Sequence, residues 1–119
     1  MQTLPSYKGV LITNVLNRDQ SQLWWLRDLL TEYIFPEELM RLITDRDLWY
    51  TISIYQTLSE DFIIEMADYV DWNQAILHQQ LSEDFVLANL SHFNLSLVRL
   101  CYTELWKQHH LNTYLALKG

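Results

Sequence analysis

Apolar residues recur along much of this chain at the spacing of short amphipathic helices. One helical face is formed by positions i, i+3, i+4 and i+7 of the stretch that follows Asp71, namely Trp72, Ala75, Ile76 and Gln79. Another apolar face begins at Phe62 and continues through Ile63 and Met66. Polar residues interrupt these faces after only a few turns, so the pattern predicts short helices joined by tight corners.

The stretch from Trp49 to Val70 is repeated 23 residues later. Seven residues return at this fixed offset: Trp49, Gln56, Leu58, Ser59, Glu60, Asp61 and Phe62 recur as Trp72, Gln79, Leu81, Ser82, Glu83, Asp84 and Phe85. A weaker copy precedes them at Phe35 to Leu39, and an eroded copy follows from Asn94. So short a period is typical of a stacked array of small units, none of which buries its own apolar face.

The chemistry of helix starts explains most of the repeated string. Ser59 and Ser82 each stand where a hydroxyl can cap the helix that follows. The acidic pairs Glu60–Asp61 and Glu83–Asp84 fall in the first turn, where the helix dipole favours negative charge. Pro36 opens the corresponding helix of the weaker upstream copy. Each repeat is therefore predicted to form two short helices. Such helices are only marginally stable in isolation and gain their stability from packing against neighbours.

Composition supports an all-α fold. The chain has 119 residues, half of them apolar, with only two Gly and two Pro, which argues against a turn-rich β-sandwich. We expect a single domain over residues 1–119, built as a solenoid-like array of stacked short helical hairpins. Residues 19–94 would form the repeats and residues 95–119 a C-terminal capping helix or helices. Residues 1–18 are expected as an N-terminal extended arm or short strand, between which periodicity does not decide.

The repeated motif resembles one found in other proteins. The string W-x-x-I-S-x-Y-Q-x-L-S-E-D-F-I, beginning at Trp49 and followed by Val70-Asp71-Trp72, is similar to a tandem repeat of bacteriophage proteins and proteins of large DNA viruses. The likeness is specific over residues 47–86 and extends over 26–105. The second copy departs from it, with Ala75-Ile76 in place of Ile-Ser. The resemblance implies a viral, phage-type origin and a helical scaffold, and it brings no catalytic residue.

Charge and cysteine content bear on partners and compartment. The net charge is −7 and only eight Lys and Arg are present, so direct binding to nucleic-acid phosphates is not expected. An acidic surface instead suits a basic protein partner. The single cysteine, Cys101, lies in an apolar run and is expected to be a buried, inert thiol. With no apolar run of about 20 residues, no membrane contact is expected, and the host cytoplasm is the expected compartment.

Few groups in the sequence suggest catalysis. The four histidines, His78, His92, His109 and His110, have no partners at metal-ligand spacing. No nucleophile-elbow, zinc-protease or glycine-rich phosphate motif is present, and two glycines cannot build a phosphate cradle. We therefore expect no enzyme activity, no cofactor and no metal.

The first functional hypothesis is a protein-interaction module that binds and inhibits a host protein complex by steric occlusion. Targets of this kind include CRISPR or restriction defence complexes and host polymerases. Trp24 and Trp25 are neighbours on an expected helix between Ser21 and Tyr33, so they cannot both face one core. One of them is predicted to be an exposed anchor for the partner.

The second hypothesis is a nucleic-acid mimic. Acidic pairs recur once per repeat and would form a carboxylate ladder along one edge, comprising Glu37, Glu38, Glu60, Asp61, Glu83 and Asp84. Such a row could occupy a groove that normally receives phosphates, whereas the alternative is a row of solvated helix starts.

The third hypothesis is a structural or assembly role with homodimers. A candidate dimer face has the spacing i, i+4, i+7 and i+8 and consists of Val98, Tyr102, Leu105 and Trp106. The alternative is that these side chains pack onto the preceding repeat.

Overall fold

The described residues have an all-α fold with one short strand pair. The computed structural model describes residues 1–108, and these residues form nine α-helices, one 3-10 helix and two strands. The chain divides into two compact units, Met1–Asp71 (unit 1) and Trp72–Gly119 (unit 2).

The elements of each unit follow one another closely along the chain. Unit 1 contains β1 (Gln2–Thr3), α1 (Ser6–Arg18), α2 (Trp24–Glu32), β2 (Tyr33–Ile34), α3 (Glu37–Met40), α4 (Arg46–Tyr55) and α5 (Glu60–Glu65). Unit 2 contains α6 (Trp72–His78), α7 (Glu83–Ala88), the 3-10 helix η1 (Leu90–His92), α8 (Leu95–Cys101) and α9 (Thr103–Gln108). Outside α1, no helix of the described residues exceeds ten residues, as the interrupted apolar pattern predicts.

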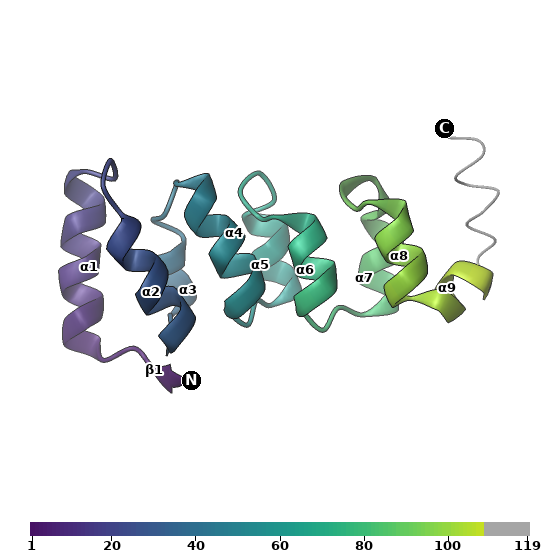
Figure 1. The fold of residues 1–119 in the computed structure, drawn as a ribbon, viewed down its shortest axis with the longest axis horizontal. Helices are drawn as coiled ribbons and strands as arrows, with labels where there is room; N and C mark the ends of the chain where they lie inside the picture. The colour runs from purple at the N-terminus through teal and green to yellow at the C-terminus, as the bar shows by residue number, and fades with distance from the viewer. Residues whose placement is uncertain (109–119) are drawn as a thin grey trace. The chain divides into compact units, whose positions relative to one another are not determined.

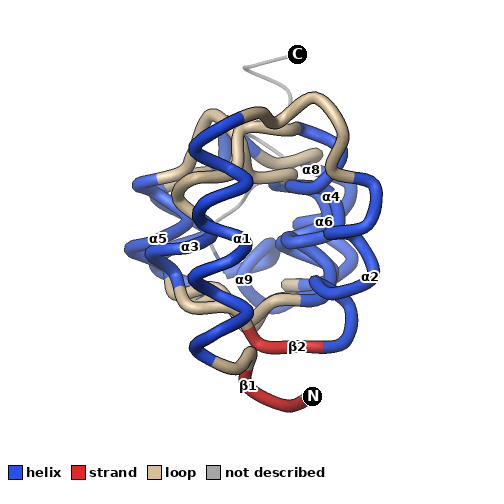
Figure 2. The backbone as a smooth tube through the Cα atoms, turned by 90° about the vertical axis from the view of Figure 1, so that its left-hand side faces the viewer, coloured by secondary structure: helices blue, strands red, loops and turns tan. Residues whose placement is uncertain are grey.

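Unit 1 has its helices in two rows with one helix across the end. The helices α1, α2 and α4 lie side by side, with α3 and α5 behind them (Figure 1). Seen from the end of the unit, α2 and α4 occupy one side, α3 and α5 the other, and α1 stands in front of both rows (Figure 2). The unit therefore presents two different side faces, one made by α2 and α4 and the other by α3 and α5.

The helix α1 is fastened at both of its ends. Below it, β1 pairs in parallel with β2, with Gln2 opposite Tyr33 and Thr3 opposite Ile34. At its other end the Gln20 side chain donates a 2.7 Å hydrogen bond to the carbonyl of Leu42 and accepts a 3.0 Å hydrogen bond from the backbone N–H of Thr44. The middle of α1 lies between these two attachments.

The core of unit 1 is centred on Trp49. This side chain is fully buried, and its indole N–H donates a 2.7 Å hydrogen bond to the carbonyl of Ile43. Its ring lies 6.1 Å, centroid to centroid, from the rings of both Phe62 and Tyr69. Because Phe62 belongs to α5 and Trp49 to α4, this contact joins the two rows of helices.

A buried glutamine closes the corner between α2 and α3. The Gln56 side chain is only 2% exposed. Its Oε1 accepts a 2.9 Å hydrogen bond from the N–H of Phe35, and its Nε2 donates 2.7 Å bonds to the carbonyls of Leu30 and Tyr33. A single amide thus satisfies three backbone groups that leave a helix and enter a turn.

Unit 2 repeats the aromatic packing of unit 1 within itself. The Trp72 ring lies 6.0 Å from Phe85 and stacks on His92 at 4.1 Å. These two partners stand 23 residues after Phe62 and Tyr69, the ring partners of Trp49, although the rings around Trp49 are tilted and those on Trp72 are stacked. The sequence offset therefore corresponds to an equivalent local cluster in each unit.

The predicted helix starts at the repeated serines are confirmed. Ser59 Oγ accepts a 3.1 Å hydrogen bond from the N–H of Phe62 at the start of α5, and Ser82 Oγ accepts a 3.2 Å bond from Phe85 at the start of α7. The expected helix in the segment from Ser21 begins later, at Trp24.

The expectation of an extended N-terminal arm over residues 1–18 is wrong beyond the first few residues. Only Gln2–Thr3 is a strand, and Ser6–Arg18 is the helix α1. Val10, Ile12, Thr13 and Val15 are β-branched and favour extended chain, but Ile12 and Leu16, one turn apart, are buried against the rest of the unit. Tertiary packing therefore overrides local propensity here.

The cysteine prediction is also wrong. Cys101 is the last residue of α8 and is exposed, whereas Val98, three residues earlier, supplies the buried face of that helix. The apolar run around Cys101 continues onto the outer side of α8, where Leu100 is exposed as well.

Candidate functional site

The net charge of the chain is confined to unit 1. Residues 1–71 hold twelve Asp and Glu against five Lys and Arg, whereas residues 72–119 hold three of each. Unit 1 therefore carries the whole charge of −7 and unit 2 is neutral. A cationic partner would be attracted to unit 1, with an effect that salt screens beyond about 10 Å.

Large aromatic side chains gather on the outer side of α2 and α4. Trp24 is 75% exposed, and Tyr50 and Tyr55 are each 49% exposed. Trp25, by contrast, is half-buried, and its indole N–H donates a 3.1 Å hydrogen bond to the carbonyl of Gln22. Of the two predicted tryptophans, Trp24 is therefore the one available to a partner.

The helical period explains why these aromatics face outward. Helix α2 buries Leu26 and Leu30, which stand one turn apart, so Trp24 at its first turn projects to the other side. Helix α4 buries Trp49 and Ile52 among its inward positions, which leaves Tyr50 on the outer side. The core residues of the two helices thereby fix the direction of the exposed rings.

Two adjoining hollows lie between the outer sides of α2 and α4. The larger, of about 580 Å³, is lined by Arg27, Thr31, Asp47, Tyr50, Thr51, Ile54 and Tyr55. The smaller, of about 240 Å³, includes Trp24 in its lining and shares Arg27 and Asp47 with the larger one. We call this surface, made by Trp24, Arg27, Asp47, Tyr50 and Tyr55, the α2–α4 face.

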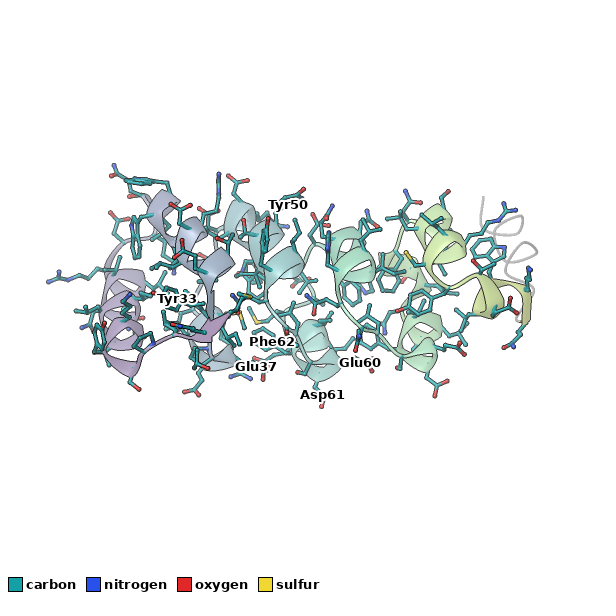
Figure 3. The ribbon with its side chains drawn as sticks, turned by 60° about the horizontal axis from the view of Figure 1, so that its bottom comes forward. Tyr33, Glu37, Tyr50, Glu60, Asp61 and Phe62 are labelled. Atoms are coloured by element: carbon teal, nitrogen blue, oxygen red, sulfur yellow. The ribbon has the colours of Figure 1, made fainter. Side chains whose placement is uncertain are left out.

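The acidic residues of α3 and α5 lie on the opposite side of unit 1. Glu37, Glu60 and Asp61 are on one side in Figure 3, and Tyr50 is on the other. The Glu37 carboxylate accepts a 3.0 Å hydrogen bond from the hydroxyl of Ser59, so the starts of α3 and α5 are linked. With the exposed Glu38 these residues form the acidic edge of unit 1.

One arginine offsets part of this charge. Arg41 forms an ion pair with Glu65, including a 3.1 Å hydrogen bond from Nη2 to Oε1. The hydrogen bond to Glu65 raises the pKa of Arg41, and the charges of Glu37 and Glu38 raise this pKa further. The same pairing lowers the pKa of Glu65 from its ordinary value of 4.5. The acidic edge therefore includes a cation and is not a continuous row of carboxylates.

The remaining predicted site residues belong to unit 2. Glu83 and Asp84 are exposed in the first turn of α7. The proposed dimer face lies largely in the interior: Val98, Leu105 and Trp106 are buried. Tyr102 is half-buried, and its hydroxyl donates a 2.8 Å hydrogen bond to the carbonyl of Leu81. These four side chains are therefore engaged in the packing of the chain itself.

Two of the four histidines belong to the described residues. His78 is exposed at the end of α6, and His92 stacks on Trp72, whereas His109 and His110 lie outside the described residues. Within residues 1–108, no three His, Cys, Asp or Glu side chains are grouped as metal ligands would be.

Sequence reasoning missed most of the α2–α4 face. No sequence pattern marks its other residues as a site, because they come together only when α2 packs against α4. These residues are Arg27, Asp47, Tyr50 and Tyr55. A partial signal was present, since Tyr50 follows the core residue Trp49 and therefore projects to a different side of α4.

Within residues 1–108, no helix combines the length and apolar character required to span a bilayer. No protein-family model, no curated protein and no solved structure matches this chain.

Proposed function

We propose that this chain is a phage-type protein-interaction module that binds a host protein complex through unit 1 and inhibits it by steric occlusion. The observation that carries the proposal is the α2–α4 face, where three exposed aromatic rings surround two adjoining hollows. A defence complex of the CRISPR or restriction type is a target of the expected kind. The module would act in the cytoplasm of the infected host cell.

The composition of the face supports this role. Trp, Tyr and Arg are the residue types most enriched among interface hot spots, because they bury large areas and also carry a polar group. The α2–α4 face offers Trp24, Tyr50 and Arg27 within one region. Exposed aromatic rings gathered in one region with polar residues beside them are typical of a surface that a partner covers.

The charge of unit 1 supports a basic partner. The charge of −7 on unit 1 attracts a positively charged surface and speeds encounter more than it strengthens the final contact. A complex that normally holds nucleic acid has such a surface.

The scaffold we propose is a solenoid-like array of 23-residue hairpins. Its support is the recurrence of one aromatic cluster, in which Trp49, Phe62 and Tyr69 of unit 1 correspond to Trp72, Phe85 and His92 of unit 2. An array of this kind gives a small chain an extended surface for binding.

A nucleic-acid mimic remains a second candidate, and one observation favours it. Glu37, Glu60 and Asp61 lie on a common side of unit 1 (Figure 3). The Arg41–Glu65 pair within the same region weakens the candidate, because a phosphate mimic should present negative charge alone.

Affinity capture with matched variants tests the proposal. The tagged chain should recover a stoichiometric complex from lysate of the phage's host, and the purified complex should lose activity when the chain is added. Trp24→Ala and Tyr50→Ala should each weaken binding about tenfold or more, as hot-spot truncations do. The control is Leu100→Ala, because Leu100 is exposed like Trp24 but lies in unit 2. Recovery of no partner, or equal binding by all variants, would overturn the proposal.

A further inference from the structure

An open apolar groove lies between α1 and α3, on the side of unit 1 away from Tyr50. Its volume is about 650 Å³. Gly9, Val10 and Thr13 of α1 line one wall, and Glu38, Leu39 and Leu42 in and after α3 line the other. In the end view α3 lies beside α1 (Figure 2). We call it the α1–α3 groove.

The groove stays open because α1 is held at both ends and has no side chain at Gly9, between these ends. The strand pair fixes one end of α1, and the hydrogen bonds of Gln20 to Leu42 and Thr44 fix the other. Between these attachments Gly9 has no side chain, and a Cβ atom built on it would meet no atom within 4 Å. The wall of α1 therefore leaves space that no side chain of the described residues fills.

The groove has the surface chemistry of a helix-binding site. Val10 is 61% exposed on the wall, and Ile34 in the lining is exposed as well, so apolar area faces water. Glu38 belongs to the same lining and continues into the acidic edge that includes Glu37. An occupant that matches this surface must combine an apolar stripe with positive charge beside it.

We propose that the α1–α3 groove binds a basic amphipathic helix of a partner protein. Apolar side chains at i, i+3 or i+4, and i+7 of that helix contact Val10, Ile34 and Leu42. Lysine or arginine side chains along its edge pair with Glu38 and the acidic edge. The groove follows α1 over about two helical turns, which matches the reach of such a set of anchors.

Charge and shape favour this occupant over two others. A second copy of the chain would bring another −7 to the same side, and like charges oppose that contact. A small apolar ligand would stay partly in water, because the hollow is not enclosed, unlike pockets that bury most of a ligand's surface. A basic helix satisfies both the apolar lining and the charge.

A pair of neighbouring substitutions tests the proposal. Val10 and Leu11 are both 61% exposed, but only Val10 lines the groove. Val10→Lys and Leu11→Lys therefore make the same change of charge at equal exposure, and neither touches the core. The probe is a fluorescently labelled amphipathic helical peptide of Leu and Lys, with a Leu and Glu peptide of the same pattern as its counterpart, and binding is followed by anisotropy.

The expected result is selective loss of binding in the groove variant. The wild-type chain and Leu11→Lys should bind the Leu–Lys peptide, Val10→Lys should bind it at least about tenfold more weakly, and the Leu–Glu peptide should not bind. Gly9→Trp should weaken binding similarly because the indole fills the groove, whereas Gly9→Ala should not. Glu38→Gln should lower affinity about two- to fivefold, as expected for one exposed charge pair, and the equivalent Asp28→Asn on α2 should have less effect.

Three outcomes would overturn the proposal. The first is no binding of the Leu–Lys peptide by the wild-type chain, and the second is equal binding by Val10→Lys and Leu11→Lys. The third is a wild-type dimer by light scattering that Val10→Lys converts to a monomer, which would make a second copy the occupant. Trp24→Ala should leave peptide binding unchanged, so failure of the α2–α4 face and failure of the groove are distinguishable.

Discussion

At the scale of single residues, Gln56 shows how one polar side chain stabilises a corner of the fold. Its amide is buried and contacts the backbone at Leu30, Tyr33 and Phe35, all at least 21 residues earlier in the chain. The residue recurs as Gln79 in the second copy of the repeat. The recurrence is visible in the sequence, but its reason is not, because the three backbone groups are distant in the chain.

Replacement of Gln56 by leucine should be strongly destabilising. Leucine is similar in size and apolar, so the main effect is loss of partners for three backbone groups, two of them in buried hydrogen bonds and one in a partly buried bond, at about 1–3 kcal/mol for each buried group. We expect Gln56→Leu to lower the free energy of unfolding by roughly 3 kcal/mol or more, measured by urea denaturation. The control is Gln22→Leu, since Gln22 is exposed and should change stability by less than about 0.5 kcal/mol. A loss below about 1 kcal/mol for Gln56→Leu would refute this role.

Trp24 is the residue of the candidate site that the sequence predicts best. Two adjacent tryptophans on one helix point in different directions, which favours one of them on a flank, although adjacency alone does not decide this because Leu105 and Trp106 are adjacent and both buried. Which of the pair is exposed depends on the packing of Leu26 and Leu30 and is settled only by the fold. The hollows beside Trp24 depend on two helices and therefore have no counterpart in the sequence pattern.

At the scale of elements, the helices of the repeats and the helix α1 differ in how far local sequence determines them. The helices that follow Ser59 and Ser82 begin where the capping pattern predicts, because a cap involves residues only three positions apart. Helix α1 has no side-chain cap, and it contains Gly9 and a run of β-branched residues. Its contacts with β2 and Thr44 are long-range, so its sequence alone suggested an extended arm.

Gly9 gives a direct test of α1 as a helix. A glycine inside a helix costs roughly 0.5–1 kcal/mol relative to alanine, and the position has free space for a methyl group. Gly9→Ala should therefore raise the free energy of unfolding by about that amount, seen as a higher midpoint in thermal or urea denaturation. If residues 6–18 were an extended arm, the same substitution would have little effect, and a loss of stability would contradict the helix.

At the scale of the whole molecule, charge and repeat do not follow the same pattern. The two clear copies of the repeat carry the same acidic pair, Glu60–Asp61 in unit 1 and Glu83–Asp84 in unit 2. Only unit 1 has an excess of negative charge, because its other acidic residues outnumber its basic ones. The repeat therefore supplies the scaffold, and the residues outside the repeated motif supply the electrostatic difference.

This difference predicts unequal effects of equal substitutions. Neutralising Glu60 and Asp61 to Gln and Asn should slow association with the basic partner about two- to fivefold at low salt, and the same changes at Glu83 and Asp84 should have less effect. Stopped-flow or surface-plasmon measurements of the association rate constant would show this. Raising the salt to about 500 mM should remove the difference by screening. Equal effects of the two pairs would instead favour the carboxylate ladder of the mimic.

The attachment of α1 also determines the order in which unit 1 can form. Both of its ties reach forward, from Gln2 to Tyr33 and from Gln20 to Thr44. A chain emerging from the ribosome cannot close either loop until those later residues have left the exit tunnel. Helix α4, in contrast, meets α5 within a few residues of its own end. The segment that contains α1 must therefore wait for residues that are made later, and its long loops close more slowly than the short connection between α4 and α5.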